Sequence, residues 1–243
     1  MDVQELKRKA AEKAVEYVRP GMVLGLGGGS TAALAIKRIG ELVQEGKLDD
    51  IYGVPCSTKV EARAREYGVP LTSLDDEAEL DLTIDGADEV DDDLNLIKGG
   101  GGALVWEKIV AEVSRREIIV VDESKLSAVI GTNEPVPVEV LYFGLRTHRA
   151  YLEELGAETS IRTVENGTKY VSDNGNFIID CDYGAIEEPR RLAAQIKQRP
   201  GIIDHGLFVD YADDVIVAGE DGIRHLRADR HGGRRVKVER STR

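Results

Sequence analysis

The sequence predicts an α/β fold with a mainly parallel sheet and an inserted α+β domain, and two observations carry this prediction. Up to residue 131, short apolar strands alternate with helices that have one apolar face, which is the pattern of βαβ units. After Pro135 the order changes to β-α-β-β-α-β over about 70 residues, the split βαβ pattern of a ferredoxin-like module. We therefore expect a Rossmann-like, doubly wound sheet with an inserted ferredoxin-like α+β domain.

The first part of the chain supplies the parallel sheet. It opens with a helix, because apolar residues recur at helical spacing over residues 6–18 and Pro20-Gly21 stops the helix. A strand at 22–26 then runs into a glycine-rich turn and a helix that continues to Leu42. The remaining expected elements are strands at 51–54, 80–84 and 118–121 and helices at 59–67 and 103–115.

The second part of the chain supplies the inserted domain. Asn166-Gly167 and Asn174-Gly175 provide turn residues between its middle strands, because Asn and Gly adopt the backbone conformations that tight turns need. A strand at 214–218 and a short helix at 222–226 then return the chain to the first domain. The strands of the insertion are expected at 136–143, 158–164, 177–183 and 202–209, with one helix after the first strand and another at 186–198.

These elements define the expected domains. Residues 1–131, completed by 210–227, form the Rossmann-like catalytic domain, and residues 132–209 form the inserted ferredoxin-like domain. Residues 228–243 carry six basic and two acidic side chains and no apolar period. We expect this segment to be a mobile basic tail, and we assign it no role.

Composition excludes several classes of protein. The 243 residues include 45 acidic and 32 basic side chains, a formal net charge of −13, which nucleic acids and anionic membranes would repel. A small anionic substrate remains compatible if basic residues gather locally. The two cysteines are far apart, the N-terminus lacks the apolar core of a signal peptide, and no apolar run is long enough to span a membrane. We expect a cytoplasmic globular protein without nucleic-acid or membrane partners.

The first motif is Gly25-Leu26-Gly27-Gly28-Gly29-Ser30-Thr31, a glycine-rich turn between a strand and a helix. Glycines let backbone N–H groups approach an anion, and a helix N-terminus adds unpaired donors and a favourable dipole. A phosphate group fits this site. The dinucleotide fingerprint needs glycine where Ser30 stands, and the Walker pattern needs Gly-Lys-Ser/Thr, so neither nucleotide motif matches. A tight turn without a ligand is the alternative.

The second motif, Asp85-Gly86-Ala87-Asp88, directly follows the strand expected at 80–84. Ligands of open α/β sheets bind at the carboxyl ends of the strands. The two aspartates are therefore candidates for proton transfer or for hydrogen bonds to sugar hydroxyls. The acidic residues that follow are expected to be a solvated charge run, because the glycine and glutamate positions of a calcium loop are not matched.

The third and most distinctive motif is Lys98 followed by four glycines, 99–102, and then by Glu107. Four consecutive glycines lose much chain entropy on folding, so a protein that contains them is expected to need a close backbone approach to a ligand. Lys98 can stabilise negative charge that develops on a substrate oxygen, and Glu107 can act as a base. For Glu107 alone, an exposed helix glutamate paired with Lys108 is the alternative.

A fourth segment, Asp122-Glu123-Ser124-Lys125, follows the strand expected at 118–121. Lys125 is therefore directed to the same edge of the sheet and could bind phosphate or a substrate oxygen, although taken alone it is an ordinary loop lysine. The four histidines lie outside all of these segments, which argues against a histidine-based hydrolase. No histidine or cysteine cluster predicts a metal site.

Taken together, these segments resemble a known family, the type A ribose-5-phosphate isomerases. The resemblance runs from about Leu6 to Leu226, and the order and spacing of five segments make it specific. One departure is visible, since the family usually has threonine where Gly28 stands, so one hydroxyl contact is missing. The segments are Gly27-Gly28-Gly29-Ser30-Thr31-Ala32-Ala33, Pro55-Cys56-Ser57-Thr58, Asp85-Gly86-Ala87-Asp88-Glu89, Ile97-Lys98-Gly99-Gly100-Gly101 with Glu107-Lys108-Ile109, and Val121-Asp122-Glu123-Ser124-Lys125.

The resemblance implies an aldose–ketose isomerase (EC 5.3.1.6) of the non-oxidative pentose phosphate pathway, with a ferredoxin-like domain inserted in a Rossmann-like one. Such an enzyme interconverts D-ribose 5-phosphate and D-ribulose 5-phosphate through an enediolate, without a metal or an organic cofactor. Glu107 would move the proton between carbons 2 and 1, while Asp85, Asp88 and Lys98 would open the sugar ring, transfer hydroxyl protons and stabilise the oxyanion. The substrate-binding positions would be Gly28, Gly29, Ser30, Thr31, Gly86, Ala87, Gly99, Gly100, Gly101, Lys125 and Lys7.

The resemblance also implies a homodimer or a homotetramer, with the regions of Trp106 and Tyr142 as candidates for the contact. Other functions remain open. A non-catalytic sugar-phosphate sensor would need a DNA-binding module, but the first 20 residues are too short for one and the basic tail has no helix-turn-helix pattern. Another aldose–ketose isomerase, acting on an amino-sugar phosphate, and an acyl-CoA transferase of similar fold are the remaining alternatives.

Overall fold

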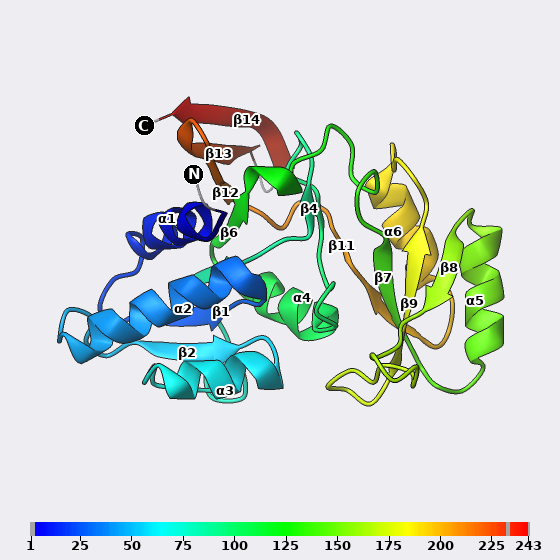
Figure 1. The fold of residues 1–243 in the computed structure, drawn as a ribbon, viewed down its shortest axis with the longest axis horizontal. Helices are drawn as coiled ribbons and strands as arrows, with labels where there is room; N and C mark the ends of the chain where they lie inside the picture. The colour runs from blue at the N-terminus through cyan, green and yellow to red at the C-terminus, as the bar shows by residue number, and fades with distance from the viewer. Residues whose placement is uncertain (1–2, 232–233, 243) are drawn as a thin grey trace. The chain divides into compact units, whose positions relative to one another are not determined.

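The computed structural model describes residues 3–231 and 234–242 of the chain. It contains two compact units, and each is made of more than one stretch of chain (Figure 1). The predicted motifs are consequently divided between the units. The first unit consists of Met1–Ala87, Trp106–Lys125 and Asp210–Arg243, and the second consists of Asp88–Val105 and Leu126–Val209.

The first unit is built on a seven-stranded sheet with the order β14-β13-β12-β6-β3-β1-β2. Neighbouring strands from β2 to β12 are parallel, whereas β13 pairs antiparallel with both β12 and β14. The mainly parallel sheet that the sequence predicts is thus confirmed. The strands are β1 (Val23–Leu26), β2 (Tyr52–Pro55), β3 (Leu82–Asp85), β6 (Glu117–Asp122), β12 (Asp214–Gly219), β13 (Gly222–His231) and β14 (Arg234–Thr242).

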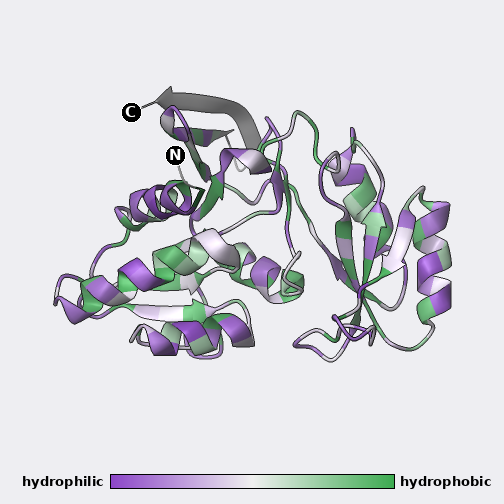
Figure 2. Cartoon of the chain, viewed as in Figure 1, coloured by the Kyte–Doolittle hydropathy of each residue, from purple (hydrophilic) through white to green (hydrophobic). Residues whose placement is uncertain are grey.

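Helices pack on this sheet. They are α1 (Val3–Val15), α2 (Gly29–Gln44), α3 (Thr58–Glu66) and α4 (Leu104–Glu112), and the short 3-10 turn η1 (Glu123–Lys125) follows β6. Helix α1 contacts α2, β6 and β12, while α3 contacts α2 and β2. Polar and apolar bands alternate along the helices (Figure 2), as expected when one face of each helix is buried. No helix among the described residues is long and apolar enough to cross a membrane.

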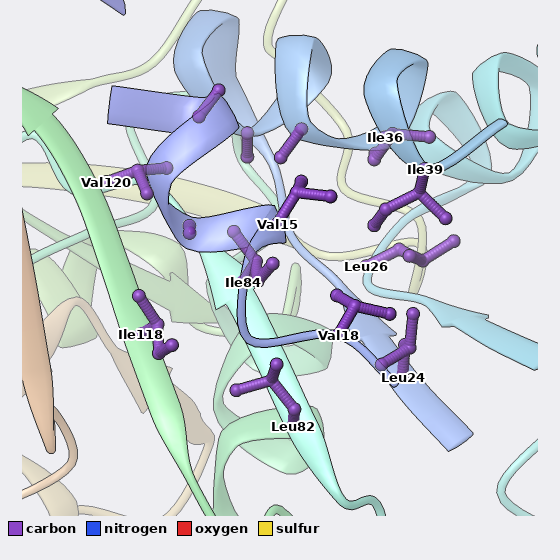
Figure 3. Packing of buried hydrophobic residues seen from close by; sticks show 14 of the residues in the cluster. Val15, Val18, Leu24, Leu26, Ile36, Ile39, Leu82, Ile84, Ile118 and Val120 are labelled. Carbon is purple, nitrogen blue, oxygen red and sulfur yellow. The ribbon is translucent and has the colours of Figure 1, made fainter. Parts of the chain in front are cut away.

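The core of the first unit lies between the sheet and helices α1 and α2. In Figure 3, Ile36 and Ile39 of α2 face Leu24 and Leu26 of β1, and none of these four side chains is more than 2% exposed. Full burial of an aliphatic side chain of this size contributes about 1.5–3 kcal/mol. This layer therefore holds β1 firmly, and with it the start of the glycine-rich turn.

The order of the parallel strands reverses beside β1. Strand β1 has β2 on one side and β3 on the other, and the sheet continues outward from β3 to β6 and β12. In open α/β sheets, ligands bind at the carboxyl ends of the strands where the order reverses. Gly27 directly follows β1 and Asp85 is the last residue of β3, so the first two motifs lie at this point.

The second unit contains two sheets. Its main sheet is antiparallel, with the chain order β7-α5-β8-β9-α6-β10 and the strand order β10-β7-β9-β8. The β-α-β-β-α-β arrangement predicted from the sequence is therefore confirmed. These elements are β7 (Val136–Val140), α5 (Leu145–Glu154), β8 (Glu158–Ile161), β9 (Phe177–Asp182), α6 (Pro189–Lys197) and β10 (Ile202–His205). The smaller sheet consists of β11 (Leu207–Phe208), β5 (Leu96–Ile97) and β4 (Glu89–Val90).

The boundary between the units differs from the one expected. Residues 88–105 and 126–131 belong to the second unit, whereas the sequence predicts them in the first. The reason is main-chain pairing at long range. Strand β5 pairs with β4 on one side and with β11, more than 100 positions later in the chain, on the other, and short strands of two residues leave no recognisable pattern in the sequence.

The C-terminal segment also differs from expectation. Residues 222–226 were expected to form a short helix and residues 228–243 a mobile tail. Instead, β13 covers Gly222–His231 and pairs with β12, and the described part of the remaining segment forms β14. The helix and tail predictions fail because a backbone ladder at the edge of a sheet does not require the apolar alternation that reveals a half-buried strand.

Candidate active site

Asp85 is the last residue of strand β3, and its side chain holds the turn that follows β1. Its Oδ1 accepts hydrogen bonds from the backbone N–H groups of Gly28 and Gly86, both at 2.7 Å, and the residue is 1% exposed. Bonds to an ionised acceptor are short and strong. One carboxylate therefore joins the two loops, and glycine is required in this space because a Cβ on Gly27 would lie 2.3 Å from the Cα of Asp85.

Glu107 lies in the first turn of α4 and is 7% exposed. A carboxylate oxygen of Glu107, one of Asp85 and the sulfur of Cys56 all lie within 4.8 Å of one another. A Cβ added to Gly28 would lie 3.0 Å from Glu107 Oε1, so the Glu107 carboxylate reaches the glycine-rich turn. Burial rules out the exposed helix glutamate that the sequence left as an alternative.

The N-terminus of α2 gathers groups that the sequence predicts for phosphate binding. Backbone N–H groups in the first turn of a helix have no partner within it and carry partial positive charge. Gly29 and Ser30 are exposed there, whereas Thr31 is buried. Lys7 of α1 donates a hydrogen bond from Nζ to Ser30 Oγ at 3.0 Å. A positive charge therefore lies beside this end of the helix.

Lys7 is held by a carboxylate from a neighbouring strand. Its Nζ lies 3.8 Å from Oδ2 of Asp122, the last residue of β6, and the Lys7 side chain is 17% exposed. Asp122 Oδ1 also accepts a hydrogen bond from the Ser124 N–H at 3.0 Å, in the turn that ends at the half-buried Lys125. Lys125 consequently follows the carboxyl end of β6, the edge of the sheet at which the sequence analysis predicted it.

Lys98 follows β5 in the second unit and is only 2% exposed. Its Nζ lies 5.5 Å from the ring centroid of Phe208, a distance at which a cation is attracted to an aromatic face. Its backbone N–H donates to the carbonyl of Gly206 at 2.9 Å, which fixes the end of β5. Burying an ammonium group is costly, and a lysine kept in such a place is a strong candidate for a function.

The glycine loop 99–102 is tied down on two sides. Asp88 Oδ2 accepts a hydrogen bond from the Gly100 N–H at 2.8 Å. Arg162 donates from Nη1 to the carbonyl oxygens of Gly99 at 2.8 Å and of Gly100 at 3.0 Å. The loop thus has a defined conformation despite its glycine content.

Tyr170 makes a third attachment to this loop. Its hydroxyl donates to the carbonyl of Gly101 at 3.2 Å. Burial, reinforced by the negative charge of Asp173, raises the pKa of Tyr170 above its ordinary value. The hydroxyl therefore stays protonated and remains a donor across the physiological pH range.

The predicted site residues fall into two groups. The chain passes from the first group to the second between Ala87 and Asp88, and it returns between Val105 and Trp106. The group in the first unit consists of Lys7, Gly28, Gly29, Ser30, Thr31, Asp85, Gly86, Ala87, Glu107 and Lys125. The group in the second unit consists of Asp88, Lys98, Gly99, Gly100 and Gly101.

One group of side chains among the described residues lies close enough together to hold a metal ion. It consists of Cys56, Asp85 and Glu107, all of which are buried. A thiolate and two carboxylates are donors that zinc accepts. Since the sequence predicts a reaction without a metal, chelation is a necessary control in any assay of this site.

Several residues of the site were missed by the sequence analysis. Cys56 received no role, although it directly follows β2, the parallel neighbour of β1, and so stands at the same sheet edge. Arg162 and Tyr170 were not identified at all. Arg162 is 62 positions from Gly100 in the chain, and no motif surrounds it, so only the fold reveals the contact.

Comparison with known proteins finds similarity to one family over most of the chain. The sequence model of a family described as "Ribose 5-phosphate isomerase A (phosphoriboisomerase A)" matches residues 52–222. "Ribose-5-phosphate isomerase A" of Desulfatibacillum aliphaticivorans is 51% identical over 223 residues, which cover 92% of this chain and 97% of the relative. The protein of the same name from Chloroflexus aurantiacus is 52% identical over 220 residues, which cover 90% of this chain and 92% of the relative.

Solved structures of proteins with the same description are also similar to this chain. A D-ribose-5-phosphate isomerase in complex with phospho-erythronic acid superposes with a TM-score of 0.91 at 40% identity, covering 93% of this chain and all of the other. The ribose 5-phosphate isomerase of Plasmodium falciparum superposes with a TM-score of 0.90, also at 40% identity and with the same coverage.

Proposed function

The chain belongs to the ribose 5-phosphate isomerase A family, and from this premise we propose that it interconverts D-ribose 5-phosphate and D-ribulose 5-phosphate with Glu107 as the base. The observation that carries the assignment of the base is its position. Glu107 is 7% exposed, and its carboxylate lies beside Asp85 and the glycine-rich turn. A carboxylate with little access to water is suited to removing a proton next to a carbonyl group.

The phosphate of the substrate is assigned to the N-terminus of α2. The backbone N–H groups of the exposed residues Gly29 and Ser30 and the nearby Nζ of Lys7, 3.0 Å from Ser30 Oγ, provide donors and positive charge for a dianion. Lys125, at the carboxyl end of the neighbouring strand β6, supplies further charge. This assignment fixes one end of the sugar and leaves the opposite end for the chemistry.

Isomerisation then requires a proton to move between two adjacent carbons. In the open-chain aldose, Glu107 removes the proton from carbon 2, and the electron pair forms the enediolate as negative charge develops on the carbonyl oxygen. Glu107 returns the proton to carbon 1, while a hydroxyl proton passes from oxygen 2 to oxygen 1, which gives the ketose. A positioned carboxylate base contributes about a hundred- to ten-thousand-fold to such a step.

Asp85, Asp88 and Lys98 are assigned the remaining steps. The two backbone N–H groups that bind Asp85 Oδ1 hold that carboxylate in one orientation, which suits a group that opens the sugar ring and relays hydroxyl protons. Lys98 is assigned to the developing oxyanion, where each preorganised donor stabilises the transition state by about 3–4 kcal/mol. The roles of Asp88 and Lys98 rest on the match to the family's motifs.

Conversion of D-ribose 5-phosphate to the ketose by the purified protein tests this function. We expect Glu107→Gln to lower turnover about a hundred- to ten-thousand-fold. Glu112→Gln is the matched control, because Glu112 is exposed on the same helix, and it should leave turnover unchanged. Calorimetric titration with phospho-erythronic acid, the ligand in the structure of a relative, should give the same affinity for both variants and for the parent protein.

Other outcomes would redirect the assignment. Full activity of Glu107→Gln would remove Glu107 from the role of base. Binding of D-ribose 5-phosphate without any turnover would favour a sugar-phosphate sensor, and a covalent thioester on a glutamate after incubation with an acyl-CoA, detected by mass spectrometry, would favour a transferase.

We further propose that the protein is a cytoplasmic homodimer or homotetramer. Charged sugar phosphates do not cross membranes readily, so the enzyme is expected in the compartment that makes them. Leu141, Tyr142 and Phe143 are 40%, 69% and 81% exposed at the end of β7, and three adjacent apolar side chains in water are typical of a contact surface. Trp106, the other candidate, is half-buried. Light scattering coupled to size-exclusion chromatography measures the oligomeric state.

A further inference from the structure

The loop of four glycines in the second unit is attached to the main sheet of that unit by one side chain. Arg162 directly follows β8, and its Nη1 donates to two consecutive carbonyl oxygens, those of Gly99 and Gly100, at 2.8 and 3.0 Å. An arginine that binds two backbone carbonyls fixes the orientation of two consecutive peptide units.

The peptide unit between Gly99 and Gly100 connects Arg162 to Asp88. No peptide bond in the described chain is cis, so the C=O and N–H of this unit point in opposite directions. Its C=O accepts from Arg162 at 2.8 Å, and its N–H donates to Asp88 Oδ2 at 2.8 Å. A rotation of this one plane would therefore break the contact to Arg162 and the contact to Asp88 together.

Arg162 is itself held rigidly. Its Nε donates to Asp180 Oδ2 at 3.0 Å, and its Nη2 donates to Asp180 Oδ1. Its backbone N–H donates to Ile178 and its carbonyl accepts from Tyr170, both at 2.9 Å. The side chain is 15% exposed. A fork of this kind fixes the guanidinium plane with little remaining rotational freedom.

We propose that Arg162 is a positioning residue that orients Asp88 through the peptide unit between Gly99 and Gly100. Arg162 has no part in proton transfer. Its effect is to keep the Asp88 carboxylate in one orientation relative to the glycine loop, with Asp180 holding the guanidinium in turn. This inference rests on the proposed function, because Asp88 matters to turnover only if the site is that of the isomerase.

Arg162→Lys is the variant that tests this role. Lysine keeps the positive charge and can bind Asp180, but it lacks the planar fork that reaches both a carboxylate and two carbonyls. We expect kcat to fall about tenfold to a hundredfold, the range that follows from a small displacement of a reacting group, while KM changes little. Arg191→Lys is the matched control, since Arg191 forms an ion pair with Glu188 in which both side chains are 68% exposed.

A double-mutant cycle separates positioning from a general loss of structure. If Arg162 acts through Asp88, then Arg162→Lys adds little once Asp88→Asn is present, and the two effects are non-additive by about tenfold or more. Asp180→Asn provides a second variant, which leaves Arg162 in place and should give a smaller loss with the same non-additivity. Independent, multiplicative effects of Arg162→Lys and Asp88→Asn would overturn the proposal.

Hydrogen exchange gives a readout that does not depend on turnover. The Gly100 amide is predicted to exchange faster in Arg162→Lys than in the parent protein, because the peptide plane that directs this N–H at Asp88 is no longer held through the Gly99 carbonyl. Parent turnover is measured first, and its absence would reject the proposed function and this inference with it. Normal parent turnover together with unchanged kcat and unchanged Gly100 exchange in Arg162→Lys would overturn this inference alone.

Discussion

Both glycine-rich loops of this protein have a backbone N–H group bound by an aspartate, and the loop after β5 has further attachments at its carbonyl groups. In the loop after β1, a backbone N–H group is fixed, since Gly28 donates to Asp85 at 2.7 Å. In the loop after β5, the Gly100 N–H likewise donates to Asp88 at 2.8 Å, and the carbonyl groups of Gly99, Gly100 and Gly101 also accept from the side chains of Arg162 and Tyr170. Two glycine-rich sequences are therefore held in place by different sets of contacts. The first loop packs its backbone directly against Asp85, to which we assign a role in proton transfer, whereas the second also depends on Arg162 and Tyr170 from elsewhere in its unit.

The largest difference between the loops is predicted for alanine substitutions. A Cβ on Gly27 would lie 2.3 Å from three atoms of Asp85, whereas a Cβ on Gly101 meets nothing within 4 Å. Gly27→Ala should therefore lower the free energy of unfolding by about 1–3 kcal/mol and abolish most turnover. Gly101→Ala should leave stability unchanged or raise it by up to about 1 kcal/mol. Denaturant titration of both variants measures this, and equal losses would contradict the comparison.

A smaller effect is predicted at Gly28, where the family usually has threonine. A Cβ there would lie 3.0 Å from Glu107 Oε1 and 3.8 Å from Cys56 Sγ, so the glutamate must shift by a few tenths of an ångström. The added hydroxyl is a donor beside the proposed phosphate site. Gly28→Thr should lower KM for D-ribose 5-phosphate about two- to tenfold, as one hydrogen bond does. Gly28→Val, which adds the branched side chain without the hydroxyl, is the control, and an equal gain would show that the hydroxyl is not responsible.

The smallest effect is predicted for chelation. The potential metal ligands Cys56, Asp85 and Glu107 lie next to the loop after β1. The proposed proton transfers require only carboxylates and a lysine. Turnover should therefore be the same before and after prolonged incubation with excess EDTA. Loss of turnover that zinc restores would mean that this group holds a metal in the active enzyme.

Much of the fold could be predicted because its signals are local. The alternation of strands and helices, the position of the glycine-rich turn before α2, and Asp85 at the carboxyl end of β3 all follow from periodicity and from glycine chemistry. The β-α-β-β-α-β order of the insertion is also a local signal. These features need no knowledge of which strands pair.

What could not be predicted depends on contacts between distant residues. The pairing of β5 with β11 and the edge strands β13 and β14 arise from backbone hydrogen bonds, which any sequence can make. Arg162 and the glycine loop lie in segments that share no motif. The link from Arg162 to Asp88 through one peptide unit therefore leaves no signal in the sequence. For Glu107, the sequence indicated the residue, but only its burial distinguishes a base from an exposed helix glutamate.

Because the first unit is built from three separate stretches of chain, it cannot be completed on the ribosome until the last stretch has been synthesised. Strand β12 (Asp214–Gly219) lies between β6 and β13 in the first sheet, so β6 remains an open edge until residue 219 has emerged. The second unit ends at Val209 and can finish first, although the first unit began earlier. During translation the nascent chain therefore exposes an unpaired parallel strand, a feature that favours aggregation. Slow elongation through residues 126–213 would prolong that interval, and chaperone demand should be greatest there.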